Sequence, residues 1–94
     1  MEIKQLEVYS QAPNAGIVKM PGRAFPGIVI QGDSLAILIS TVQQVVEQAK
    51  QCNNSELEES ISLLQDQLEA YQAHYERVLK EHGMRLPYPE ARSS

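Results

Sequence analysis

The chain has 94 residues, with 12 Asp and Glu against 8 Lys and Arg, a net charge of −4 and a sequence pI near 5.0. This length supports one hydrophobic core, so we expect a single domain over residues 1–94, with a β and turn part (1–33), a helical hairpin (34–82) and a tail (83–94). The acidic balance argues against nucleic acid as a partner, because phosphates are bound by surfaces rich in Lys and Arg.

The first third of the chain predicts strands. Leu6 and Val8 alternate with polar neighbours, which is typical of a half-buried strand over about residues 2–10. Ile3 falls out of phase with this alternation. It therefore indicates either a bulge or the edge of the strand.

Two further strands follow in this part of the chain. Pro13–Gly16 provides a turn, and residues 17–20 predict a second strand that pairs antiparallel with the first. Residues 28–30 predict a short third strand. The β part is thus expected to be a small antiparallel sheet or hairpin within residues 2–30.

Two Pro-Gly pairs surround a short loop. Pro21-Gly22 and Pro26-Gly27 are the pairs expected at the centre of type II turns, since Pro sets the first φ and Gly accepts a positive one. They hold Arg23 and Phe25 on a stiff loop. Either these two residues recognise a partner, or Phe25 plugs the end of the helix pair while Arg23 caps carbonyls or pairs with Asp33.

Residues 34–82 contain neither Gly nor Pro and predict two helices. The first covers about 34–52, with Asp33 as its N-cap. Its apolar positions recur every three or four residues and form one broad stripe. The stripe consists of Leu35, Leu38, Val42, Val45, Ala49 and Cys52, widened by Ile39 and Val46.

The second helix covers about 55–82. Asn53 and Asn54 break the first helix, Ser55 with Glu58 predicts a capping box, and Gly83 is the expected left-handed C-terminal residue. The apolar positions again alternate by four and three. They are Leu57, Ile61, Leu64, Leu68, Tyr71, Tyr75, Val78 and His82.

These elements predict an α+β fold in which the sheet packs on an antiparallel two-helix hairpin. The first helix would be about 27 Å long and the second about 40 Å, so the second must extend beyond the first. Its last turns, with Tyr71, Tyr75 and Val78, then need a partner. We expect the sheet to fill this role first, with the tail at 86–89 or another molecule as alternatives.

A four-residue block, taken alone, predicts a serine nucleophile. Gly32-Asp33-Ser34-Leu35 matches the nucleophile block of the GDSL esterases and lipases and lies at a strand-to-helix junction. A serine nucleophile requires a base that is oriented by a third group, and that family supplies it from a C-terminal Asp-x-x-His, which this chain lacks. We therefore expect a structural junction and no enzymatic activity.

A metal site would have to combine Cys52, His74 and His82. The two histidines are eight residues apart, about 12 Å along a helix, which is too far for both to bind one ion. We expect no metal and no cofactor. His82 instead carries a charge suited to a helix C-terminus.

The negative charge is concentrated in the helices. Residues 1–33 are neutral, residues 34–82 carry −5, and the block 56–69 has five acidic residues, among them Glu59 and Asp66, with no Lys or Arg. The acidic residues either favour the N-terminal half of the second helix or attract a basic partner.

The compartment is predicted from what the sequence lacks. Cys52 is the single cysteine and cannot close an intrachain disulfide, and Met1–Lys4 has no basic start or apolar run of a secretory signal. The longest apolar run, Leu35–Ile39, is far shorter than the roughly 20 residues that cross a bilayer. We expect a cytoplasmic protein with no membrane partner.

Residues 20–35, MPGRAFPGIVIQGDSL, followed by YQAHYERVLKEHG at 71–83 and LPY at 86–88, resemble a family of small uncharacterised bacterial proteins. The resemblance covers nearly the whole chain and brings no activity with it. It implies a free-standing bacterial module. It also implies that Arg23, Phe25, Gln31 and Asp33 belong to a shared core or site.

Three functions remain open from the sequence. The first is an acidic protein-binding module, such as an immunity protein or antitoxin. The second is a homo-oligomer that pairs through the second helix, and the third is ligand binding or hydrolysis at the Gly32–Leu35 turn. The candidate partner-binding residues are Arg23, Phe25, Asp33, Glu59, Asp66, Tyr71, His74 and Tyr75.

Overall fold

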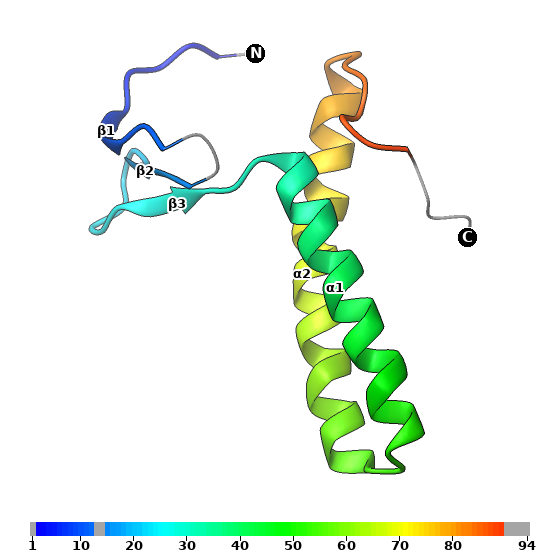
Figure 1. Cartoon of the computed structure of the whole chain (residues 1–94). Helices are drawn as coiled ribbons and strands as arrows, with labels where there is room; N and C mark the ends of the chain where they lie inside the picture. The colour runs from blue at the N-terminus through cyan, green and yellow to red at the C-terminus, as the bar shows by residue number, and fades with distance from the viewer. Residues whose placement is uncertain (1, 13–14, 90–94) are drawn as a thin grey trace.

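The computed structural model describes residues 2–12 and 15–89. Three strands are followed by two long helices (Figure 1): β1 (Glu7–Ser10), β2 (Gly16–Lys19), β3 (Gly27–Val29), α1 (Gly32–Gln51) and α2 (Ser55–Glu81). The predicted α+β class is confirmed. Both helices begin and end within two residues of their predicted bounds.

The strands form one antiparallel sheet in the order β1-β2-β3. Val8 pairs with Val18, and Ile17 pairs with Ile28. β1 is shorter than the predicted strand over residues 2–10, and Ile3 lies outside it, fully exposed. The irregularity in register lies instead between Val8 and Ser10, where β1 has one extra residue.

The loops between the strands are only partly as predicted. At Pro21-Gly22, Gly22 has φ +79° and the Arg23 N–H donates to the Met20 carbonyl, 3.2 Å away, as a type II turn requires. Gly27 has no positive φ and begins β3, so the second type II turn is wrong. The predicted turn residues Pro13 and Asn14 lie outside the described residues.

α1 begins one residue before the predicted cap. Gln31 is the N-cap and makes no side-chain cap hydrogen bond, while Asp33 lies inside the first turn, where its carboxylate accepts from the Ser34 N–H at 2.8 Å. Asp33 is therefore not the N-cap. A carboxylate in the first turn still faces the positive end of the helix dipole, so it stabilises the start of α1.

The turn between the helices is made by two asparagines. Asn53 adopts φ +54°, a left-handed conformation that Asn tolerates better than most residues. The Asn54 side chain then caps α2 by accepting from the Leu57 N–H at 3.1 Å. The predicted capping box from Ser55 to Glu58 is wrong, because Ser55 is already the first helical residue.

α2 ends as predicted at Gly83, which has φ +66°. The Gly83 N–H donates to the Lys80 carbonyl, and the Met84 N–H donates to the Leu79 carbonyl at 2.9 Å. This pair of bonds is a Schellman motif and satisfies carbonyls that the end of a helix otherwise leaves without partners.

The helices pack along a narrow seam. α1 buries Leu35, Ile39, Val42, Val46 and Ala49, whereas Leu38 and Val45 from the predicted stripe remain exposed. α2 likewise buries one side of its predicted stripe and exposes the other. Ile61, Leu68 and Tyr75 are partly buried and Gln72 is buried. Leu57, Leu64 and Tyr71 are exposed. Each helix therefore buries only one half of its broad apolar stripe.

The expected packing of the sheet on the hairpin is not found among residues 2–12 and 15–89. The strands contact one another and the helices contact one another, and the sheet is joined to α1 through Ile30 and Gln31 (Figure 1). The last turns of α2 have other partners. Tyr75 lies against Gly32 at the start of α1, and Tyr88 of the tail hydrogen-bonds Glu76.

Gly32 is the residue that lets α2 approach the start of α1. A Cβ at this position would overlap the ring of Tyr75. We predict that Gly32→Ala lowers the free energy of unfolding by about 1–2 kcal/mol, since the ring must leave its partly buried place. The measurement is thermal unfolding followed by circular dichroism, with a fall of several degrees expected.

Gly27→Ala is the matched control, because Gly27 has no atom within 4 Å of an added Cβ and no positive φ. This variant is expected to unfold at the wild-type temperature or slightly above it. Equal losses in the two variants would contradict the close contact between Gly32 and Tyr75.

Candidate functional site

The structure distributes the predicted partner-binding residues over three places. Arg23 and Phe25 lie on the β2–β3 loop, and Glu59 and Asp66 lie on the outer side of α2. The remaining four lie at the end of the hairpin where α1 begins and α2 ends. These are Asp33, Tyr71, His74 and Tyr75.

The sheet and its loop form an arm that the rest of the described chain does not cover. Ile17 and Val18 are neighbours on β2, so their side chains point to opposite faces of the sheet. Val8 pairs with Val18 and Ile28 pairs with Ile17, so Val8 and Ile28 also lie on opposite faces. Both are exposed, Val8 to 53% and Ile28 to 59%. Neither face of the arm is therefore buried.

Phe25 is the most exposed aromatic side chain of the arm, at 82%. It does not plug the helix pair. The loop that carries it lines a hollow of about 370 Å³, together with Arg23 and Met20. Among the described residues Arg23 forms no ion pair with Asp33. The structural alternative, in which Phe25 plugs the helix pair and Arg23 pairs with Asp33, is therefore wrong.

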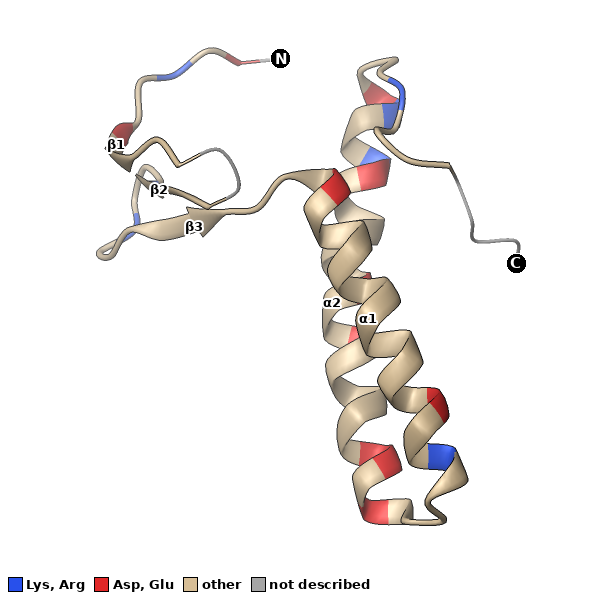
Figure 2. Cartoon of the chain, in the orientation of Figure 1, with Lys and Arg blue, Asp and Glu red and all other residues tan. Residues whose placement is uncertain are grey.

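The acidic residues gather near the start of α2, whereas Lys and Arg are found near its end (Figure 2). Glu58, Glu59 and Asp66 line a shallow hollow of about 460 Å³ on the outer side of the helix. This arrangement complements the helix dipole, with negative charge at the N-terminus. It is equally able to attract a basic surface.

The Gly32–Leu35 turn holds no catalytic pair in the part of the chain that the structure describes. No side chain hydrogen-bonds the Ser34 hydroxyl, and the nearest link of Ser34 is its backbone N–H to Asp33. The Arg77 guanidinium donates to Nδ1 of the His74 ring at 2.8 Å. The turn thus serves as a junction between the sheet and α1.

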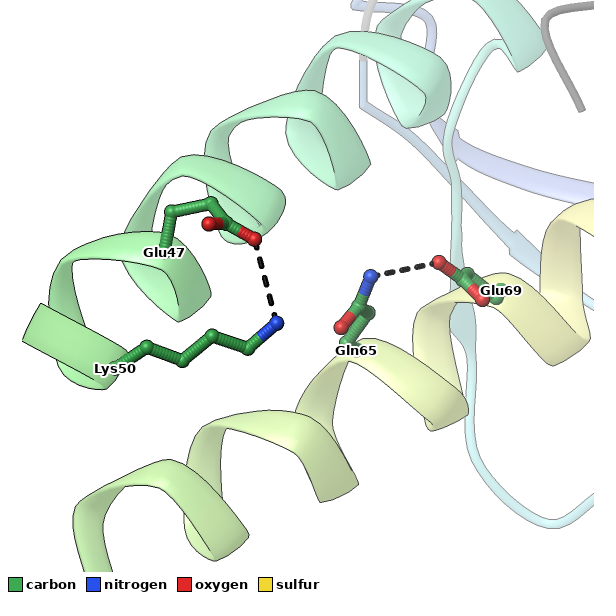
Figure 3. A network of polar contacts seen from close by, with 4 residues as sticks. All are labelled: Glu47, Lys50, Gln65 and Glu69. Carbon is green, nitrogen blue, oxygen red and sulfur yellow. Dashed lines mark hydrogen bonds and ion pairs between the residues drawn. The ribbon is translucent and has the colours of Figure 1, made fainter. Parts of the chain in front are cut away.

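One face of the hairpin, here called the tail face, is contacted by the tail and carries several polar side chains. Its hollow of about 250 Å³ is lined by Ala36, Ile39, Ser40, Gln43, Glu69, Gln72 and Glu76 of the helices and by Tyr88 and Pro89 of the tail. Figure 3 shows Gln65 donating to Glu69 on α2 at 3.0 Å, and Lys50 paired with Glu47 on α1 at 3.4 Å.

Tyr88 fixes the tail to this face. Its hydroxyl donates to the Glu76 carboxylate at 2.8 Å. Burial, and then the hydrogen bond to Glu76, raise the pKa of Tyr88 to about 12. The sequence offered the tail at 86–89 as an alternative partner for the last turns of α2, and the bond from Tyr88 to Glu76 is such a contact.

The opposite face of the hairpin, here called the open face, is apolar. With 3.6 residues per turn, each helix has a second row of exposed residues on the side of the seam that is opposite to the tail face. They are Leu38 and Val45 of α1 and Leu57, Leu64 and Tyr71 of α2. The sequence placed all five in the apolar stripes, because the period of a broad stripe does not show which half is buried.

We predict that the Tyr88 contact weakens at alkaline pH. A folded-state pKa above the ordinary value of 10 means that the contribution of Tyr88 to stability is complete below pH 10 and is lost as the pH rises to about 12. Absorbance titration of the phenolates should show one tyrosine with a pKa near 12 in the wild type.

Tyr88→Phe should remove this component of the titration, and Glu76→Gln should lower its pKa. Tyr71→Phe is the control, because Tyr71 lies on the open face and its loss should leave the component near 12 in place. A Tyr88→Phe titration identical to the wild type would contradict the contact.

Two further observations concern metal binding and membrane insertion. In residues 2–12 and 15–89 no three His, Cys, Asp or Glu side chains are grouped so that they could hold a metal ion. Within the same residues, no helix has both the length and the apolar character needed to cross a bilayer.

Comparison with models of known protein families assigns the chain to one family. A model of a family of unknown function, DUF6959, matches residues 1–88. The chain belongs to this family. Neither the curated proteins nor the solved structures yield a match.

Proposed function

We propose that this member of DUF6959 is a cytoplasmic, non-enzymatic protein-binding module, comparable to a small acidic immunity protein or antitoxin, that binds its partner through the sheet arm. One observation carries the proposal. The arm exposes apolar side chains on both faces, and no described helix covers either of them.

The physical support is the instability of such a sheet by itself. Strands of three and four residues bury little area, and a small sheet needs a packed apolar face to be independently stable. The helices do not provide this packing here. A protein partner that covers the arm would supply it, and large exposed apolar patches are typical of interaction sites.

The loop supports the same surface. Gly22 and the bond from the Arg23 N–H to the Met20 carbonyl fix the turn before binding, so little conformational entropy is lost on association. Phe25 follows this turn and offers an exposed aromatic side chain two residues from the cation Arg23. Aromatic residues and Arg are the side chains that most often dominate binding energy. We expect the partner to present an apolar pocket with a carboxylate at its border.

The test is affinity capture from lysate of the organism that encodes the protein, followed by mass spectrometry. Phe25→Ala should reduce capture of the partner about tenfold or more, as expected for a central anchor residue. Ile37→Ala is the control, since Ile37 is also a highly exposed apolar residue, at 69%, and lies on the outer side of α1. Capture that is the same for both variants would contradict the role of the arm.

The non-enzymatic part of the proposal predicts that Ser34→Ala changes no activity. Wild-type protein and this variant should hydrolyse p-nitrophenyl esters at the same background rate. Hydrolysis by the wild type that disappears in Ser34→Ala would instead establish the hydrolase alternative at the Gly32–Leu35 turn.

A further inference from the structure

We infer that the open face of the hairpin binds the same face of a second copy of the chain, so that two hairpins form a four-helix bundle. This inference concerns the helices, and it goes beyond the proposed function, which concerns the sheet arm. It also differs from pairing through the end of α2 alone, because both helices contribute to the contact.

The first support is the spacing of the open-face residues. Leu38 and Val45 are seven residues apart on α1, and Leu57, Leu64 and Tyr71 are seven apart on α2. Each set therefore forms a ridge along one side of its helix. Two such ridges side by side are the surface that a helical hairpin presents to another in a bundle.

The second support is the distribution of charge. The positions that border the open face are uncharged residues and one histidine: Ser34, Thr41, Gln48, Ser60, Gln67 and His74. Glu56 approaches this border only in the first turn of α2. Arg77 reaches the border near the other end of α2, where its guanidinium contacts His74. The remaining charged residues of the two helices lie on the tail face or on the outer sides.

This distribution favours a second copy as the occupant. Residues 34–82 carry −5, so two copies repel each other unless their contact face is free of charge. A basic partner would be bound better by the acidic sides of the helices, and the open face offers it no carboxylate. An uncharged apolar face on an acidic hairpin is what a self-complementary interface requires.

The third support is the area that one chain leaves exposed. Its accessible surface is 7733 Å², whereas a compact protein of this mass exposes about 5400 Å². Its radius of gyration is 16.1 Å, against about 12 Å for a compact chain of this length. The uncovered sheet arm accounts for part of this excess, and the open face of the hairpin accounts for another part. A standard interface buries about 800 Å² on each partner.

The small core agrees with this estimate. Among the described residues no side chain is less than 2% exposed, and the buried apolar residues are five, all on α1. Tyr88 and Pro89 of the tail occupy part of the other face of the hairpin, so the open face is where a second hairpin adds to the core.

The experiment measures molar mass by sedimentation equilibrium from low to high micromolar concentration. The wild type is expected to have twice the mass of the 10.5 kDa chain. Leu64→Lys should raise the dimer dissociation constant at least a hundredfold, because it places a charge in the middle of the apolar contact. A wild type that has the mass of one chain at all concentrations overturns the inference, as does any larger stoichiometry.

Leu63→Lys is the matched control. Leu63 and Leu64 are neighbouring leucines that are 59% and 46% exposed, but Leu63 faces the outer side of α2. This variant should keep the dimer mass. Equal effects of the two substitutions would show that the dimer, if present, does not use the open face, and would overturn the inference.

A variant that keeps the side-chain shape separates loss of contact from loss of folding. If Leu64→Lys loses its helical circular dichroism, the test rests on Val45→Thr. This substitution replaces a methyl group of the open face by a hydroxyl with little change of volume. It should weaken the dimer about tenfold with helicity retained; unchanged dimer affinity overturns the inference. The proposed function fails separately, because it depends on capture through Phe25 and not on mass.

Discussion

The seam between α1 and α2 is the interaction on which the rest of the structure depends. Leu35, Ile39, Val42, Val46 and Ala49 of α1 are the apolar residues that become buried, and they do so against α2. Each large aliphatic side chain contributes roughly 1.5–3 kcal/mol when buried. Since none of the described strands contacts a helix, this seam sets how the helices are rotated and which of their side chains remain available.

The rotation of the helices separates the two faces of the hairpin. Gly32 allows the Tyr75 ring to lie at the start of α1. The hydrogen bond from Tyr88 to Glu76 attaches the tail to the tail face. Residues from the end of the chain thus complete one side of the molecule. The other side keeps Leu64 and Tyr71 exposed, and the apolar area that remains there is the basis of the inferred dimer.

The two proposals assign different tasks to the two parts of the chain. A dimer built on the hairpin would place two sheet arms on one particle, each with its own Phe25. Bivalent presentation raises the apparent affinity for a partner that has two binding sites, without any new contact. The acidic residues on the outer side of α2 would remain exposed in such a dimer and keep it soluble.

The sequence by itself determined the local structure. The helix bounds, the left-handed Gly22 and Gly83 and the exposed loop at Phe25 follow from neighbours along the chain, because capping, turn geometry and helical period are short-range effects. Only the tertiary structure decided that Ile39 is buried and Leu38 exposed, that Leu64 and Tyr71 lie on an open face, and that the sheet stands apart from the helices. A broad apolar stripe is compatible with several rotations of its helix, and the choice among them depends on contacts such as Gly32 with Tyr75, which join residues more than forty positions apart.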